Sequence, residues 1–320
     1  MIRTSLAIAA IVATVVSLGL TVCPAAAQQV MTPGAPAEAC KAPNVSLDGR
    51  IAGCTTLIEA KKETGRSLAV AYCNRGFAFT ELRDFDRAMA DLDEAIKIDP
   101  TYACSFSNRG RVFAFKGNLE RAIADYNQAI KLDPKFATAY NNRGDALMRR
   151  GEIDKAIADF TTAIKNDPRN VHAYGNRGWA YQRMRDNHKA LADYSKAVEL
   201  EPNNLLNYIN RGNVYRIMGN LDRAASDYGE AIKVAPTDAR GWRNRGMIRL
   251  FQGDNKGGLA DYDKALQYDP ADAYSWNNRA TAKARLGDKK GAIADFRKAL
   301  EIDPSLRAAR EGLQRLGAAQ

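Results

Sequence analysis

The chain has 320 residues, of which 46% are hydrophobic and 26% are charged, and its formal net charge is +10. This composition is that of a folded soluble or repeat protein and excludes an intrinsically disordered chain. The basic balance fits nucleic acid, anionic lipid, acidic polymers or acidic peptides as partners, and it also fits charge that only maintains solubility.

Residues 1–27 have the layout of a secretory signal peptide. Arg3 precedes a long apolar run, and Ala25 and Ala27 are small enough to fit a signal peptidase. Two alternatives stay open, an uncleaved membrane anchor and lipid attachment at Cys23. We therefore expect an exported protein, periplasmic or secreted, that has no nucleic-acid partner.

The segment between this signal and the repeats contains two parts. Residues 28–39 are rich in Pro and Ala and predict a flexible lead. Residues 40–68 include "RIAGCTTLIEA", which has the pattern of the second helix of the repeats that follow. This part predicts a half-repeat that caps the N-terminal end of the array.

Four cysteines follow the signal, and an exported protein can keep them oxidised. Cys40 and Cys54 lie close together in the predicted half-repeat, so we expect a disulfide between them that prevents fraying. Cys73 and Cys104 either pair or remain buried thiols.

Residues 69–306 consist of seven consecutive repeats of 34 residues with no insertion. Each repeat has Asn-Arg-Gly at positions six to eight, except that the seventh has Ala280 in place of glycine. In the third repeat, apolar residues recur at helical spacing over 139–150 and 153–166, and Pro168 ends the second run. Each repeat is therefore expected to be a helix, a turn and a helix.

This pattern resembles the tetratricopeptide repeat family. The resemblance rests on an aromatic residue at position four, glycine at eight, a small residue at twenty, an aromatic at twenty-four and alanine at twenty-seven. The third repeat supplies these as Tyr140, Gly144, Ala156, Phe160 and Ala163. The resemblance implies an all-α fold, a right-handed α-α superhelix, that binds a protein or peptide in its concave groove.

The last segment, residues 307–320, is amphipathic. Ala308, Leu313 and Leu316 are expected on its apolar face, where they would cover the exposed end of the array. The segment therefore predicts a C-terminal capping helix.

Two features of the triplet have a packing explanation. Glycine at position eight allows the two helices of a repeat to approach closely, with a large aromatic side chain filling the space beside it. Arginine at position seven and aspartate at position twenty-three stand where the family more often has apolar residues. We expect a charge pair in place of an apolar contact, so Arg177 would bond Asp193 in its own repeat or Asp159 in the preceding one.

Catalytic signatures are absent from the sequence. It contains no GxxxxGK[ST] phosphate loop, no HExxH, no GxSxG and no GxGxxG after a strand. We therefore predict a protein that is not an enzyme and needs no cofactor or metal. The aspartate in each repeat is interpreted as an ion-pair partner rather than as a metal ligand.

The resemblance also places the first helix of each repeat on the inner wall, with positions two, five, six, nine and twelve facing the groove. Asparagine at position six offers a donor and an acceptor, so it either holds a peptide backbone or bonds neighbouring helices. The predicted peptide-binding residues are Asn142, Asp145, Met148, His172, Asn176, Trp179, Gln182, Asn210, Asn213, Arg216, Arg240 and Arg243.

These residues give the predicted groove an apolar centre and a basic end. Such a groove favours a ligand with an apolar or aromatic anchor followed by an acidic group. The sequence thus predicts a protein–protein interaction scaffold of the bacterial cell envelope. The alternative is an envelope-associated structural protein whose basic surface makes peripheral contact with anionic lipid or glycan.

Overall fold

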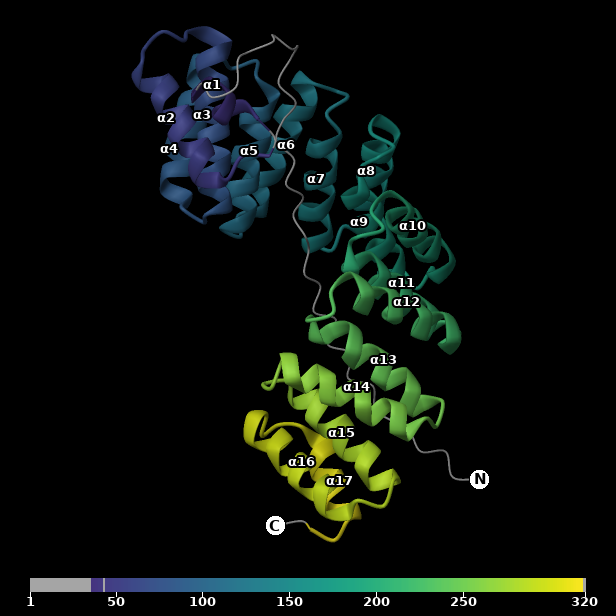
Figure 1. The fold of residues 1–320 in the computed structure, drawn as a ribbon. Helices are drawn as coiled ribbons and strands as arrows, with labels where there is room; N and C mark the ends of the chain where they lie inside the picture. The colour runs from purple at the N-terminus through teal and green to yellow at the C-terminus, as the bar shows by residue number, and fades with distance from the viewer. Residues whose placement is uncertain (1–35, 43, 319–320) are drawn as a thin grey trace. The chain divides into compact units, whose positions relative to one another are not determined.

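The computed structural model describes residues 36–42 and 44–318, so the predicted signal peptide, 1–27, lies outside the described residues. Within that part of the chain there are seventeen α-helices and no strand, which confirms the expected all-α class (Figure 1). None of these helices is both long enough and apolar enough to span a membrane.

The chain divides into two compact units, and the division falls between Arg150 and Gly151. The helices of the first unit are α1 Pro36–Lys41, α2 Leu47–Glu59, α3 Gly65–Glu81, α4 Phe85–Ile98, α5 Ala103–Phe115, α6 Leu119–Leu132 and α7 Ala137–Arg149.

The second unit contains the remaining ten helices. They are α8 Ile153–Asn166, α9 Val171–Arg183, α10 Asn187–Leu200, α11 Leu205–Ile217, α12 Leu221–Val234, α13 Ala239–Phe251, α14 Asn255–Tyr268, α15 Ala273–Arg285, α16 Lys289–Ile302 and α17 Arg307–Arg315.

Short polar side chains at position sixteen start the second helix of most repeats. In α4, for example, the Asp84 side chain accepts a hydrogen bond from the backbone N–H of Arg87, and Asn220 does the same for Arg223 in α12. Such N-caps satisfy a backbone donor that the helix itself leaves unpaired. The bounds of α8 agree with the run expected over 153–166.

The division into units falls inside the third repeat, although the sequence predicts one uninterrupted array over 69–306. This repeat keeps the family pattern, but the N-cap residue of α8 is Glu152, which makes no side-chain cap bond. The second helices of the other six repeats all have Asp or Asn there, with the cap bond formed. The third repeat thus lacks a local interaction that the others share.

Residues 36–39, which the sequence predicts as part of a flexible lead, belong to helix α1. Proline suits the first position of a helix, where its missing N–H costs no hydrogen bond. The structure contains the predicted disulfide between Cys40 and Cys54, with a Cα–Cα distance of 4.6 Å. Cys73 is a free, buried thiol, so Cys73 and Cys104 do not pair.

The core of each repeat forms where glycine at position eight meets the side chain at position twenty-four. A methyl group placed on Gly212 would lie 2.8 Å from a ring carbon of Tyr228, and one on Gly110 would lie 2.9 Å from Tyr126. Both tyrosines are fully buried. In these two repeats the helix spacing therefore leaves room for glycine alone beside the tyrosine ring.

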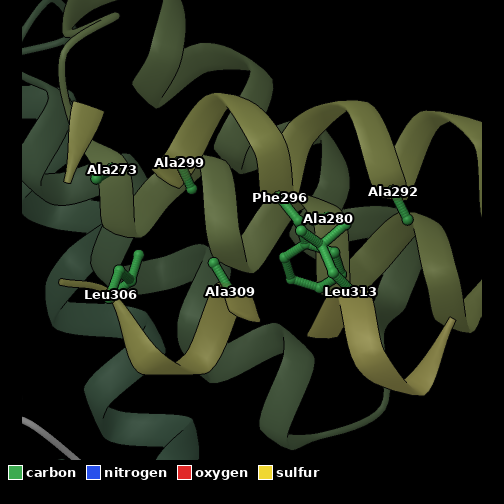
Figure 2. Packing of buried hydrophobic residues seen from close by; sticks show 8 residues of the cluster. All are labelled: Ala273, Ala280, Ala292, Phe296, Ala299, Leu306, Ala309 and Leu313. Atoms are coloured by element: carbon green, nitrogen blue, oxygen red, sulfur yellow. The ribbon is translucent and has the colours of Figure 1, made fainter. Parts of the chain in front are cut away.

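The C-terminal cluster shows the same packing with alanine at position eight. Phe296 of α16 lies against Ala280 of α15 and Leu313 of α17 (Figure 2). Leu313 and Leu316 pack against this cluster as predicted, but Ala308 is exposed and Ala309 is fully buried in its place. Burial of Ala309 and Leu313 covers the end of the last repeat.

Two glycine substitutions test this packing. Gly212→Ala should lower stability by about 1–3 kcal/mol, because the buried Tyr228 ring has no free space to move into. Gly175→Ala is the matched control, since no atom lies within 4 Å of the added methyl group and helix propensity favours alanine by about 1 kcal/mol. Thermal unfolding of both variants measures the difference, and destabilisation of equal size would contradict the packing account.

Candidate functional site

A repeated ion pair connects the two helices of a repeat. Arg211 Nη2 and Nε donate to the two carboxylate oxygens of Asp227 at 2.7 and 2.9 Å, a bidentate arrangement. The aspartate side chain is 6% exposed. Pairs of this kind join Arg75 to Asp91, Arg109 to Asp125, Arg177 to Asp193, Arg211 to Asp227, Arg245 to Asp261 and Arg279 to Asp295.

The structure therefore places each of these bonds within one repeat and not between neighbours. The guanidinium also lies over the aromatic ring at position four, with 4.4 Å between Arg279 and the Trp276 centroid. Hydrogen bonds to Asp193 raise the pKa of Arg177 above its usual value. These contacts fix the orientation of the first helix around its own axis.

Four of the repeated arginines use their remaining nitrogen to bond position twenty-five of the preceding repeat. Arg109 Nη1 donates to Asp93 at 2.7 Å, and Arg177 Nη1 donates to Thr161 at 3.0 Å. One side chain thus connects three helices.

The face of the first helix that lies opposite these arginine contacts belongs to the inner wall of the array. Several consecutive first helices contact each other, as α3 with α5 and α11 with α13 do, whereas consecutive second helices in the described residues share no comparable packing. In a curved stack the elements on the concave side lie closer together. The first helices therefore line the concave side within each unit.

In the first unit this wall is filled and internally bonded. Asn74 Nδ2 donates to the Cys40 carbonyl at 3.0 Å, and Asn108 Nδ2 lies 3.2 Å from the Cys73 sulfur. Arg111, at position nine, is 5% exposed and pairs with Glu81. Asn74 and Asn108 therefore bond neighbouring helices, which is the alternative to holding a peptide backbone.

In the second unit the wall carries polar groups that remain available. Asn210 and Asn244 are partly exposed, and their side chains make no hydrogen bond to the described residues. Trp179 is also partly exposed, at position nine of α9. The residues that the sequence prediction did not include are Asn244, which the repeated triplet indicates, and two tyrosines from the second helices.

These tyrosines reach through the repeat to hold two amides of the wall. The Tyr194 hydroxyl donates to Gln182 Oε1 at 2.8 Å, and the Tyr228 hydroxyl donates to Asn213 Oδ1 at 2.7 Å. Burial raises the pKa of Tyr228 to about 12, and Arg216 opposes this shift. Each amide keeps its NH₂ group for a ligand, in an orientation that the tyrosine fixes.

The three predicted arginines differ in their partners. Arg240 binds Asp238 at 2.8 Å, and Arg243 Nη1 lies 3.2 Å from Asp272. Arg216 has no carboxylate partner among the described residues, and its Nε is buried without a hydrogen bond. Arg216 is therefore the positive charge that this wall offers to a ligand.

The other predicted residues occupy varied surroundings. His172, Asn176 and Asn142 are partly exposed. Asp145 and Met148 are buried, at 7% and 6% exposure, and are not open groove residues as predicted. Neighbouring side chains cover them, which position in the repeat alone does not reveal. Among the described residues, no group of three or more His, Cys, Asp or Glu side chains is placed to hold a metal ion.

Comparison with known families gives a direct result. A tetratricopeptide repeat model matches residues 69–102, 137–170, 171–204 and 273–306, a second one matches 194–225, and a TPR repeat model matches 110–151. The chain is built from tetratricopeptide repeats. No curated protein matches it in sequence.

Solved tetratricopeptide-repeat structures resemble the chain in fold. The Cut9–Hcn1 hetero-tetramer of the APC/C matches with a TM-score of 0.63 and 17% identity, covering 84% of this chain and 52% of that one. A tetratricopeptide repeat protein from Parabacteroides merdae matches with a TM-score of 0.54 and 22% identity. This match covers 78% of this chain and 98% of that one.

YrrB is described as a TPR protein with an unusual peptide-binding site. It matches with a TM-score of 0.51 and 21% identity, and the match covers 59% of this chain and 97% of YrrB. The chain spans about half the length of the matched chain of the Cut9–Hcn1 structure. At such identities the comparison establishes the fold alone.

A double-mutant cycle tests the ion pair. Arg177→Gln should cost about 3 kcal/mol, because it leaves the buried Asp193 carboxylate without its partner. The coupling of Arg177→Gln to Asp193→Asn should lie between about 0.5 and 3 kcal/mol. Coupling to Asp227→Asn, in the next repeat, should be smaller than about 0.5 kcal/mol. Denaturant unfolding gives all three values, and equal coupling to both aspartates would exclude pairing within the repeat.

Burial of Asp145 predicts a pH dependence. Burial raises the pKa of its carboxyl above the usual 3.8, although Arg149 opposes the shift. The charged form is thus disfavoured in the folded state, so this group reduces stability as the pH rises through its folded pKa.

Asp145→Asn should accordingly stabilise the protein at about pH 7 and stabilise it less at about pH 4. Asp48→Asn, at an exposed position in the first turn of α2, is the control and should show no such gain. The free energy of unfolding of both variants is measured at the two pH values. A larger stabilisation by Asp145→Asn at the lower pH would contradict the predicted direction of the pH dependence.

Proposed function

We propose that the protein is an interaction scaffold that binds an extended peptide or protein segment along the inner wall of its second unit. The observation that carries this proposal is the set of available polar groups on that wall. Gln182 and Asn213 are held in place by tyrosines. Within the part of the chain that the structure describes, Asn210 and Asn244 have no side-chain hydrogen bond and Arg216 has no carboxylate partner.

Each group has a task in such binding. The asparagine amides offer one donor and one acceptor to a peptide backbone, which gives affinity without reading the ligand's side chains. Trp179 supplies an aromatic contact surface, and Arg216 favours a carboxylate. The preferred ligand is therefore a segment with an aromatic or apolar anchor and a nearby acidic residue.

The first unit does not share this arrangement, because its asparagines and its Arg111 are already bonded within the protein. The proposed site is therefore confined to the second unit. Its place in the cell is proposed from the sequence of residues 1–27, as the periplasm or the exterior of the bacterial cell envelope.

Panning a displayed peptide library against the protein tests the proposal. Selected peptides should combine an aromatic residue with Asp or Glu. Arg216→Gln should weaken binding of a selected peptide by about tenfold or more, because a desolvated carboxylate would lose its partner. Asn210→Ala and Trp179→Ala should each weaken it as well.

Arg297→Gln is the matched control, since Arg297 is an exposed arginine on α16. Circular dichroism of each variant establishes that the fold is intact. If folded Arg216→Gln and Asn210→Ala variants bind the selected peptides as tightly as the Arg297→Gln variant does, the inner wall is not the binding site.

A further inference from the structure

The exposed large apolar side chains of the described residues all occupy one kind of place. Each stands at position thirteen or fourteen of a repeat, where the first helix ends and the turn begins. They are Leu82 in the first unit and Met184, Ile217, Met218, Phe251 and Leu286 in the second, with exposures from 38% to 53%. Scattered exposed apolar residues are ordinary, but a row confined to one edge marks an interaction site.

The same places hold the excess positive charge of the second unit. We define the turn edge as residues 181–189, 215–223, 249–257 and 283–291, which are positions eleven to nineteen of four consecutive repeats. It contains eleven Lys and Arg residues and four Asp. The whole unit contains 28 basic and 22 acidic residues, so outside the turn edge the unit has no positive excess.

Most of this charge faces solvent. Eight of the eleven basic side chains are exposed, against three of the four aspartates. Lys256, Lys289 and Lys290 form no ion pair with the described residues. These cations are therefore available to an external partner.

Hydrogen bonds hold successive turns beside one another. Gln252 Nε2 donates to Asp222 at 2.7 Å, and Arg285 Nη1 donates to the Leu250 carbonyl at 2.9 Å. A shallow hollow lined by Met218 and Gln252 lies between two of the turns. The turns of the fifth, sixth and seventh repeats thus form one row and not separate loops.

The equivalent turns of the first unit differ. Residues 79–87 and 113–121 contain four basic and four acidic residues, and Leu82 is their one exposed large apolar side chain. The combination of apolar and basic side chains is therefore specific to the second unit, and the first unit provides an internal control.

We propose that the turn edge of the second unit docks on an anionic lipid bilayer. Its apolar side chains would enter the headgroup region while the flanking Lys and Arg contact lipid phosphates, the pattern that interfacial protein segments use. A second copy of the chain is a poor occupant, because two such edges repel each other. An acidic protein would satisfy the cations but would leave the separated apolar side chains without a pocket each.

This inference does not depend on the inner wall. The turn edge and the wall share Gln182 and Arg216, but the vesicle-binding variants change neither of them, so groove binding can succeed or fail separately. Asn210→Ala, which affects the wall alone, should leave vesicle binding unchanged.

Vesicle flotation tests the proposal with the full chain. The protein should bind vesicles of mixed phosphatidylglycerol and phosphatidylcholine more tightly than vesicles of phosphatidylcholine alone. The triple variant K256Q/K289Q/K290Q should bind the anionic vesicles about tenfold less tightly or worse. Residues 1–35 are common to all variants, so they contribute equally to each measurement.

The apolar contribution needs its own variant. I217Q/F251Q should lower binding to anionic vesicles and make the remaining binding more sensitive to salt. The matched controls from the first unit, L82Q and R83Q/K116Q/R121Q, should bind as the parent chain does. Circular dichroism establishes that every variant is folded.

Three results would overturn the proposal. One is equal binding to both kinds of vesicle by the parent chain. Another is a loss in the first-unit controls as large as that in the second-unit variants. The third is binding that I217Q/F251Q leaves unchanged and that salt abolishes, which indicates adsorption to any polyanion, including acidic proteins, rather than docking on a bilayer.

Discussion

The bidentate bond between arginine at position seven and aspartate at position twenty-three fixes the geometry on which the rest of each repeat depends. Its two residues come directly before those of the glycine contact in the chain, since Arg211 precedes Gly212 and Asp227 precedes Tyr228. Close approach of the backbones brings the two charges together, and the charges in turn prevent rotation of one helix against the other. A buried aspartate without its arginine would be costly, so the pair is specified as a unit.

Fixing the rotation of the first helix also determines what faces the inner wall. Asparagine precedes the arginine in every repeat, yet it has two different roles. Asn74 and Asn108 of the first unit bond a neighbouring helix, whereas Asn210 and Asn244 of the second unit make no side-chain hydrogen bond to the described residues. The helix pair is the same in these repeats, but the residues around position six determine whether its asparagine contributes to stability or to ligand recognition.

Much of this architecture is predictable from the sequence, because the information is periodic. A strict repeat of 34 residues reveals the helix pairs, the glycine contact and the existence of an arginine–aspartate pair. Whether that pair lies within a repeat depends on distances in space, which the period does not contain. The disulfide between Cys40 and Cys54 was predictable because both lie in one short segment.

The inner wall was less predictable, and the reason is physical. Position in a repeat gives the direction of a side chain but not what covers it, so Asp145 and Met148 are buried where an open surface was expected. The role of Tyr194 and Tyr228 was also hidden, since a hydroxyl that crosses the repeat to an amide is a contact between distant residues. The division within the third repeat has only Glu152 as a local sign.

The third nitrogen of the repeated arginine has a consequence for how the array responds to force. It links neighbouring repeats through position twenty-five, where Asp93 and Thr161 are acceptors but Gly229 has no side chain at all. Arg245 Nη1 faces that glycine without an acceptor, 3.9 Å from where a side chain would begin. In a one-dimensional array, cooperativity is set by such nearest-neighbour links. The fourth and fifth repeats also lack this link, because Arg211 makes no bond to Ser195. Within the second unit, tension should therefore separate one of these two junctions before it separates the sixth repeat from the seventh, which Arg279 joins through Asp263 at 2.8 Å.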